Sequence, residues 1–239
     1  MSGKKRREGS MQSKAEKQSG PIQRKFRAVL FDKDGVLLNS IDACLRAANE
    51  TFEHYGKKGM TKEEFRKNFW GTRADINIAK TFTELPPDKL KEIYDYYNQK
   101  KLEFEDMIKL YSTVIYTLEA LKGKYKLGVV TSSSKKVTLK LLEDFGILKY
   151  FDVVVGGMDT EPKPAPDPIL KACEMLGVKP TETVYVGDTL PDIEAGKAAG
   201  CTVVIVTTSM SREELQSTAG VENIFIIDGL KDLTKILGE

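Results

Sequence analysis

The stretch Phe31-Asp32-Lys33-Asp34-Gly35-Val36 places two carboxylates directly after an apolar run, Ala28 to Phe31. A short apolar run bounded by turn residues predicts a buried strand. The carboxyl end of such a strand is where open α/β sheets place ligands. Because side chains alternate along extended backbone, Asp32 and Asp34 should point to the same side. The stretch therefore predicts an α/β fold with two carboxylates facing one site.

Two adjacent negative charges favour a bound cation. Mg²⁺ fits, because it is a hard ion that takes one or two carboxylates and substrate phosphate. A lone D-x-D-G is also typical of a polar strand exit in which Gly35 serves the turn. Lys33, between the two carboxylates, should point away from both by strand alternation. Support for a site must therefore come from elsewhere in the chain.

Composition limits the class of protein. With 239 residues, 41% of them hydrophobic, the chain can form one sizeable core and a smaller second unit. The formal charge of +2 comes largely from the first 27 positions, so the folded remainder is not globally basic and no nucleic-acid partner is expected. No run of about eighteen apolar residues and no secretory signal is present, so we expect a cytoplasmic protein with no membrane partner. The oligomeric state is not readable.

Residues 1–24 are rich in Lys, Arg, Ser, Gln and Gly and have almost no apolar content, which is typical of a disordered basic arm. The alternative is a nuclear-type address or nucleic-acid tether at Lys4 to Arg7. The three cysteines match no C-x-x-C pattern and are expected to be reduced, buried thiols. The single histidine, His54, stands in a polar stretch between Glu53 and Tyr55, so we exclude serine-protease triads and His-rich metal sites.

From residue 26 onward, short apolar runs alternate with helical patterns in the rhythm of a parallel α/β sheet. Helices are predicted at Lys135–Phe145, Pro168–Leu176 and Pro191–Ala199, each followed by a glycine suited to a left-handed helix end. The strands are predicted at Arg27–Phe31, Leu127–Thr131, Asp152–Val155, Thr183–Val186, Thr202–Val206 and Asn223–Ile226.

The rhythm breaks after the first strand, where residues 40–110 show helical periodicity and no convincing strand. Thr61 with Glu64 is a capping-box pattern. We therefore expect a core domain at 25–39 and 111–239 and an inserted helical cap domain at 40–110 that opens and closes over the carboxylates. The cap helices are predicted at Ile41–Tyr55, Thr61–Phe69, Ala74–Phe82 and Pro87–Phe104.

Three further strand ends carry residues that phosphate chemistry needs. The first is Thr131-Ser132-Ser133-Ser134, whose hydroxyls could bind phosphate oxygens or serve as ordinary helix caps. The second fixes Lys163 between two prolines, where its ammonium could neutralise phosphate. The third is Gly187-Asp188 followed by Asp192, where Asp188 would complete a metal site. Asp192 could orient Lys163 or waters around that site, or favour the positive end of its helix.

In a parallel sheet the carboxyl ends of the strands share one edge, so these groups should converge. The ordered motifs D-K-D-G-V, V-V-T-S-S, E-P-K-P-A-P and V-G-D-T-L-P-D resemble the four motifs of the haloacid dehalogenase (HAD) superfamily of phosphohydrolases. The resemblance runs from about residue 26 to the C-terminus. The helical insertion resembles the cap of the phosphoglycolate phosphatase and β-phosphoglucomutase-like branch. The fold that it implies is a Rossmann-like core with a helical cap.

The resemblance also implies roles for individual residues. Asp32 would be the nucleophile and Asp34 the general acid and base, while Thr131, Ser132 and Lys163 would bind the phosphoryl group. A carboxylate at Asp34 favours phosphatases and phosphomutases over dehalogenases and transport ATPases within the family. The Mg²⁺ ligands would be Asp32, the backbone carbonyl of Asp34, and Asp188.

Substrate choice is expected to lie in the cap. Arg73, in the break Trp70-Gly71-Thr72-Arg73, could grip a second anionic group or be a solvated helix start. The family pattern places the Arg further after the Gly, so this spacing is a departure. Phe69 and Trp70 are expected to be cap core rather than substrate-stacking groups.

The resemblance predicts a Mg²⁺-dependent phosphatase that hydrolyses a small phosphorylated metabolite through an aspartyl-phosphate. The first alternative is a phosphomutase of the β-phosphoglucomutase type, which uses the same residues but excludes water. The second is a non-catalytic phosphate-binding regulatory module, although the intact Asp32, Asp34, Lys163 and Asp188 favour an enzyme.

Overall fold

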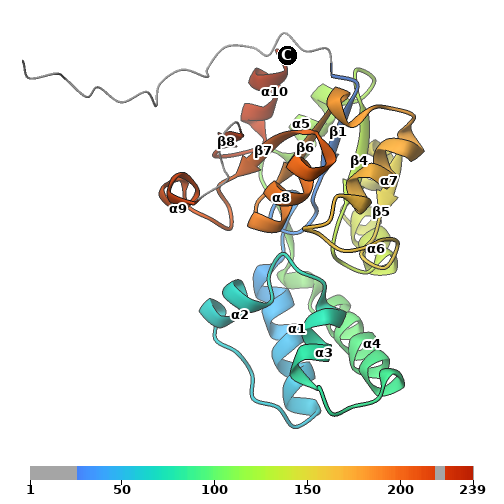
Figure 1. The fold of residues 1–239 in the computed structure, drawn as a ribbon, viewed down its shortest axis with the longest axis vertical. Helices are drawn as coiled ribbons and strands as arrows, with labels where there is room; N and C mark the ends of the chain where they lie inside the picture. The colour runs from blue at the N-terminus through green and yellow to red at the C-terminus, as the bar shows by residue number, and fades with distance from the viewer. Residues whose placement is uncertain (1–25, 219–223, 239) are drawn as a thin grey trace, which may run out of the picture.

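A computed structural model describes residues 26–218 and 224–238. A six-stranded parallel sheet in the order β5-β4-β1-β6-β7-β8 forms its core, as Figure 1 shows. The sheet and its covering helices confirm the predicted α/β class. The strands are β1 (Ala28–Phe31), β4 (Lys126–Val130), β5 (Val153–Val155), β6 (Thr183–Gly187), β7 (Thr202–Val206) and β8 (Phe225–Ile227).

Strand β1 is central because all four of its residues are buried and it pairs on both sides. Its last residue, Phe31, is level with Val129 of β4 and Val186 of β6, so the loops after these strands begin at one edge. Successive side chains alternate between two apolar clusters: Val29 lies in one and Leu30 in the other.

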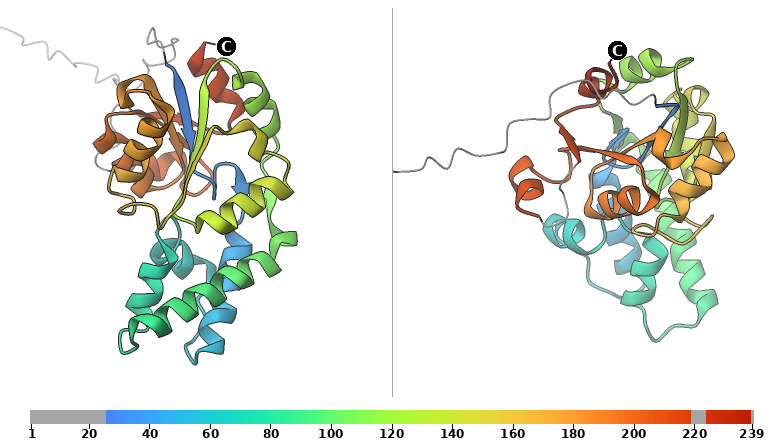
Figure 2. Two further views of the ribbon diagram at one scale, coloured as in Figure 1. Left: turned by 90° about the vertical axis from the view of Figure 1, so that its right-hand side faces the viewer. Right: turned by 45° about the horizontal axis from the view of Figure 1, so that its top comes forward.

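Helices cover both faces of the sheet (Figure 2). One face packs against α5 (Val114–Leu121), α6 (Lys135–Asp144) and α10 (Lys231–Leu237), and the other against α7 (Asp167–Leu176) and α8 (Leu190–Ala199). The short helix α9 (Arg212–Ser217) follows β7. The structure adds α5, α9 and α10, which the sequence analysis did not predict. Single 3₁₀ turns lie at Glu105–Met107, Leu148–Tyr150 and Pro180–Glu182.

A separate group of four helices lies beyond the carboxyl edge of the sheet (Figure 1). We call it the helical unit. Its members are α1 (Ile41–His54), α2 (Lys62–Asn68), α3 (Ala74–Thr81) and α4 (Pro87–Glu103), each close to a predicted helix. The unit has its own aromatic core, in which Phe52 packs edge-on against Phe69 and Phe82. The predicted capping box of Thr61 and Glu64 is confirmed at the start of α2.

Two connections join the helical unit to the sheet domain. They form a short antiparallel pair that the sequence analysis missed, β2 (Leu38–Asn39) with β3 (Lys109–Leu110). Each strand has only two residues, which is too short for a period-two pattern to be read. The outgoing and returning chains therefore lie side by side directly after the D-x-D-G loop.

The predicted basic arm at residues 1–24 lies outside the described residues. The three cysteines are free thiols, of which Cys201 is only partly buried. Within residues 26–218 and 224–238, no helix combines the length and the apolar character that crossing a bilayer requires.

Candidate active site

The carboxyl edge of the sheet and the helical unit enclose a small cavity. Its volume is about 40 Å³, which is room for about three waters. The predicted residues Asp32, Asp34, Thr131, Ser132 and Lys163 all line it. The helical unit contributes Cys44, Phe65, Phe69, Trp70, Gly71, Thr72, Ala74, Tyr94, Tyr97, Asn98 and Lys101 to the lining. The predicted convergence of these strand-end residues is therefore present in the structure.

Asp32 is held at the end of β1 by a 2.8 Å hydrogen bond from its backbone N–H to the carbonyl of Val186. Its Oδ1 accepts a 3.0 Å hydrogen bond from the buried ammonium of Lys163. Burial raises the pKa of Asp32 to about 6, and the carboxylates of Asp192 and Asp34 act in the same direction, against the Lys163 ammonium. Near neutral pH this carboxylate is therefore mostly ionised, and a cation bound beside it would lower its pKa again.

Asp192 holds Lys163 in place from the first turn of α8. Its Oδ1 accepts from the Lys163 ammonium at 2.6 Å and from the Tyr185 hydroxyl at 2.7 Å. Its Oδ2 accepts from the backbone N–H groups of Asp188 and Thr189, at 3.2 and 3.1 Å, so it also caps the helix. The sequence left two roles open for Asp192, orienting Lys163 and stabilising the start of its helix. Its contacts serve both.

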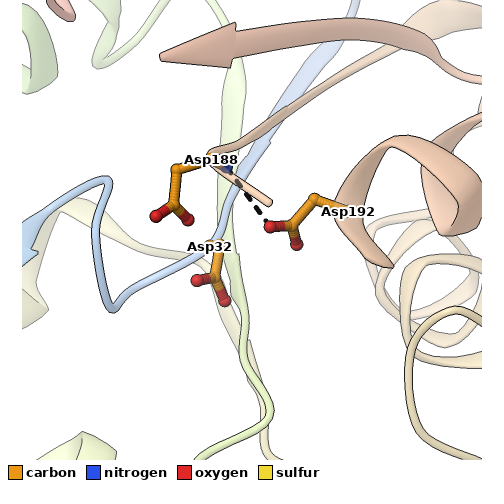
Figure 3. Close-up of side chains that lie close together, drawn as sticks. All are labelled: Asp32, Asp188 and Asp192. Carbon is orange, nitrogen blue, oxygen red and sulfur yellow. Dashed lines mark hydrogen bonds between the residues drawn. The ribbon is translucent and has the colours of Figure 1, made fainter. Parts of the chain in front are cut away.

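Asp188 lies next to Asp32 at the end of β6. Atoms of Asp32, Asp188 and Asp192 that could ligate a metal lie within 4.8 Å of one another, and Figure 3 shows the three carboxylates gathered at one point. Asp188 Oδ2 accepts from the Ser209 hydroxyl, whereas its buried Oδ1 has no hydrogen-bond partner among the described residues. Burial and the carboxylates of Asp192 and Asp32 raise the pKa of Asp188 well above its ordinary value.

These contacts test whether a divalent cation fits the site. Both Asp192 oxygens are saturated by donors, so Asp192 is not available as a direct ligand in this arrangement. The Asp188 Oδ1 atom is a buried carboxylate oxygen without a hydrogen-bond donor among the described residues, and a hard cation with oxygen ligands would satisfy it. Asp32 and Asp188 therefore fit a Mg²⁺ site.

Gly35 makes room for Asp188. Its φ of +91° is in the left-handed region, and a Cβ there would lie 1.9 Å from Asp188 Oδ2. The glycine therefore does more than serve the turn, because any side chain would displace a predicted metal ligand.

Asp34 is surrounded by donors. Oδ1 accepts from Lys33 and from Ser40, each at 2.6 Å, and Oδ2 accepts from Ser133 at 2.6 Å and from Lys101 at 3.3 Å. Burial alone would raise the pKa of Asp34, but the ammonium groups of Lys101 and Lys33 outweigh it and hold that pKa well below its ordinary value. Asp34 is therefore a carboxylate in this state.

The expectation that Lys33 points away from both carboxylates is wrong. Its side chain is fully buried and its ammonium contacts Asp34. The extended backbone ends at Phe31, and the chain turns through Lys33 to Gly35, so period-two alternation does not extend to Lys33. Lys33 instead neutralises part of the Asp34 charge.

The hydroxyl loop after β4 is divided between the cavity and Asp34. Thr131 and Ser132 line the cavity, with the Ser132 hydroxyl 3.4 Å from the Gly71 carbonyl of the helical unit. The Ser133 hydroxyl, considered in the sequence analysis only for phosphate binding or helix capping, donates to Asp34 and accepts a 3.0 Å hydrogen bond from Lys101.

Arg73 does not line the cavity. Its guanidinium pairs with Asp75 in the first turn of α3 and donates to the Thr160 carbonyl of the sheet domain at 3.3 Å. This arrangement does not support the clamp hypothesis, since the charge is already paired. Phe69 and Trp70 belong to the core of the helical unit, as expected, and also touch the cavity.

Comparison with known proteins agrees with this geometry. A model of the family described as haloacid dehalogenase-like hydrolase matches residues 29–206, which span every motif above. The chain belongs to the haloacid dehalogenase-like hydrolase family.

Relatives place this HAD hydrolase among the phosphatases. It is 37% identical over 180 residues to a phosphoglycolate phosphatase of Aquifex aeolicus, covering 73% of this chain and 82% of that one. It is 33% identical over 217 residues to the pyrophosphatase PpaX of Bacillus mycoides, covering 89% and 97%. The crystal structure of CbbY from Rhodobacter sphaeroides in complex with phosphate superposes with a TM-score of 0.76 at 27% identity, covering 87% and 96%. The enzyme class of this chain is accordingly phosphatase.

The sequence analysis missed Lys101, a cationic residue that lines the cavity of this HAD hydrolase. Lys101, near the end of α4, is 2% exposed, and with Lys163 it is one of two cationic side chains lining the cavity in the described part of the chain. Its neighbours Lys100 and Glu103 form a surface ion pair, so the local sequence reads as an exposed helix end. The available signal was Tyr97, four residues earlier on the same helix face and also buried.

Proposed function

We propose that this HAD phosphatase is Mg²⁺-dependent and hydrolyses a small phosphorylated metabolite through an aspartyl-phosphate on Asp32. The observation that carries the proposal is the closeness of Asp188 to Asp32, which lines the cavity together with Lys163. Asp188 Oδ1 is a buried carboxylate oxygen without a partner among the described residues. When bound by Asp32, Asp188 and the Asp34 carbonyl, Mg²⁺ would offset the repulsion between Asp32 and a phosphate dianion.

In the first step Asp32 attacks phosphorus, forming the aspartyl–phosphate bond while the bond to the leaving oxygen breaks. Lys163, positioned by Asp192 and Tyr185, neutralises charge on Asp32 and on the phosphoryl oxygens. Thr131 and Ser132 hold those oxygens. Asp34 gives its proton to the leaving group.

In the second step water attacks phosphorus and Asp34 takes a proton from it, which releases phosphate and restores Asp32. The geometry described above corresponds to this second step, because Asp34 is held as a carboxylate by Lys33, Lys101, Ser40 and Ser133. The first step needs a protonated Asp34, so one of the two ammonium groups beside it must move away.

Lys101 carries the ammonium group that can move, because it comes from the helical unit. An anionic group on the leaving portion of the substrate would compete with Asp34 for the Lys101 ammonium. As that ammonium turns toward the substrate, the pKa of Asp34 rises and the carboxyl can hold the proton that the first step uses. In this proposal Lys101 takes the anion-binding role first expected of Arg73.

The cavity supports a compact, doubly anionic substrate. With room for only about three waters, the cavity must widen for any substrate, and a compact substrate needs less widening than a hexose phosphate. Its walls include the aromatic groups Phe69, Tyr94 and Tyr97, with Lys101 as the cation on the helical unit. Phosphoglycolate and pyrophosphate both carry a second anion close to the transferred phosphoryl group. Entry requires the helical unit to move away from the sheet, as the predicted cap would.

A Mg²⁺-dependent activity screen over phosphoglycolate, pyrophosphate, sugar phosphates and nucleotides tests the substrate class. We expect phosphoglycolate or pyrophosphate, the two compact substrates with two anionic groups, to have the highest kcat/KM. A hexose phosphate that turns over best would contradict the size argument. Its isomerisation without phosphate release would show a phosphomutase instead.

Acid quenching during turnover followed by mass spectrometry tests the intermediate. We expect a phosphoryl group on the peptide that contains Asp32 in the native enzyme and no such group in Asp32→Asn. A phosphorylated peptide from any other part of the chain would overturn the assignment of the nucleophile.

A further inference from the structure

Trp70 links the helical unit to the predicted metal site through a single hydroxyl. Its indole Nε1 donates a 2.8 Å hydrogen bond to Ser209 Oγ, in the loop that follows β7. The same Ser209 hydroxyl contacts Asp188 Oδ2. Residues 139 positions apart are thus joined, and the connection ends on the carboxylate proposed to bind Mg²⁺.

The direction of both hydrogen bonds is determined by the groups at the two ends. An indole N–H can only donate, and Asp188 must be ionised to bind a metal, so in that state it can only accept. The Ser209 hydroxyl therefore accepts from Trp70 and donates to Asp188. This uses Asp188 Oδ2 and leaves Oδ1 as the oxygen without a partner among the described residues, so the hydroxyl determines which carboxylate oxygen is free for the metal.

Neighbouring contacts bring this part of the helical unit close to the loops around Asp188. Gly71 lies so near Thr189, the residue after Asp188, that a Cβ would be 2.9 Å from its methyl carbon. On the other side, the Thr208 hydroxyl donates to the Gly35 carbonyl at 2.6 Å, which ties the Ser209 loop to the D-x-D-G loop. The contact from Trp70 to Ser209 can form only when the helical unit lies against the sheet domain.

We propose that Trp70 and Ser209 are positioning residues that couple docking of the helical unit to the orientation of the Asp188 carboxylate toward its metal ion. The inference rests on the proposed function, because it takes Asp188 as a Mg²⁺ ligand. Coupling between two equilibria is reciprocal, so Mg²⁺ on Asp188 also favours the docked position of the unit. The metal site is then best formed when the cavity is closed around the substrate.

Calorimetric titration with Mg²⁺ alone measures the coupling without turnover. We expect Ser209→Ala to weaken binding about tenfold, as loss of a group that orients a metal ligand does. Trp70→Phe keeps an aromatic ring and removes the N–H, and we expect it to weaken binding about threefold to tenfold, in line with one hydrogen bond. The double variant should bind no more weakly than Ser209→Ala, because both changes interrupt one chain of hydrogen bonds.

Arg73→Met is the matched control. It removes another contact between the helical unit and the sheet domain, from the guanidinium to the Thr160 carbonyl, that does not lead to Asp188. We expect its Mg²⁺ affinity to stay within about twofold of the native value, since it removes no group that orients a metal ligand. An equal loss in Arg73→Met, or additive losses in the Trp70 and Ser209 variants, would overturn the proposal.

Fluorescence gives a second readout, because Trp70 is the one tryptophan of the chain. We expect Mg²⁺ to change its emission in the native protein and not in Ser209→Ala or Asp188→Asn. Suppose that Mg²⁺ binding requires Asp188 but does not change Trp70 emission, and that the Trp70 and Ser209 variants bind Mg²⁺ as the native protein does. That result would overturn the coupling through Trp70 and Ser209 and leave the proposed function standing. Mg²⁺ affinity that is equal in native protein and Asp188→Asn would overturn both.

Discussion

The Lys101 ammonium, carried by the last helix of the helical unit, lies 3.3 Å from Asp34 Oδ2 in the loop after β1. The two residues are 67 positions apart and belong to the two parts of the molecule that enclose the cavity. A charge on the helical unit therefore controls the proton affinity of a carboxylate on the sheet domain. Such a pair can make acid–base chemistry depend on closure of the site.

Replacing Lys101 by Met tests this dependence. Loss of the ammonium removes one of the two cations that lower the pKa of Asp34, so that pKa should rise and the acidic limb of the kcat profile should shift to higher pH. KM for the anionic substrate should also rise, by about tenfold for one lost charged contact. Lys100→Met, whose side chain pairs with Glu103, is the control and should leave the pH profile unchanged. An unshifted profile in Lys101→Met would contradict the coupling.

Asp32→Asn should abolish turnover while preserving the fold. We expect kcat to fall by at least about four orders of magnitude, as when other catalytic nucleophiles are removed. Asn has nearly the same shape and can still accept from Lys163, so circular dichroism should be unchanged. Mg²⁺-dependent activity that survives in this variant would sink the nucleophile assignment.

Asp188→Asn should stabilise the metal-free protein at about pH 8. The pKa of Asp188 is raised in the folded state, so the folded protein binds more protons than the unfolded chain and loses stability as pH rises above the ordinary Asp pKa. Removing the charge should raise Tm, by about 2 to 4 °C for each kcal/mol recovered. The difference from the native protein should shrink toward about pH 4, the ordinary Asp pKa, and Mg²⁺ should no longer raise Tm.

Asp192→Asn is the control of opposite sign. Contacts with Lys163, Thr189 and Tyr185 outweigh burial and lower the pKa of Asp192, so its charge contributes stability that is lost only as pH falls through that low pKa. We expect this variant to lower Tm at the same alkaline pH. If Asp192→Asn raised Tm and Asp188→Asn lowered it, the assignment of a destabilising charge to Asp188 and a stabilising charge to Asp192 would be wrong.

Mg²⁺ affinity should fall in acid. Because the pKa of Asp32 is about 6 without metal and that of Asp188 is also raised, the metal must displace protons below about pH 6. Affinity should drop about tenfold per pH unit for each proton displaced. Calorimetry in buffers of different ionisation enthalpy measures the released protons. Affinity that stays constant from neutral pH to about pH 5 would show that neither carboxylate is a ligand.

Gly35→Ala should lower the free energy of unfolding by more than the strain of its left-handed backbone conformation explains. Gly123 has a similar φ of +83°, but a Cβ at that position would meet nothing within 4 Å. Gly123→Ala should therefore cost only the left-handed penalty, about 1 to 2 kcal/mol. Gly35→Ala adds a collision with Asp188 Oδ2 and should cost several kcal/mol and weaken Mg²⁺ binding. Equal losses of stability in the two variants, measured by denaturant unfolding, would show that the space beside Gly35 does not matter.

Many elements could be predicted because their signals are local. Buried strands such as β1 and β6 appear as apolar runs, and the capping box at Thr61 needs only a few residues of sequence. The convergence of Asp32, Thr131 and Lys163 followed from the rule that parallel strands end at one edge. Lys33 was misplaced by the same local reasoning, because strand alternation stops where the chain turns.

The amino-acid sequence by itself determined the α/β class, the four strand-end motifs and the carboxylates that carry the proposed chemistry, because backbone periodicity and turn residues act over a few positions. Only the tertiary structure decided that Lys101 reaches Asp34, that Arg73 is paired outside the cavity, and that Trp70 reaches Asp188 through Ser209. Those contacts depend on how the helical unit lies against the sheet. That placement is the sum of many weak side-chain interactions between distant segments, none of which leaves a pattern in the local sequence.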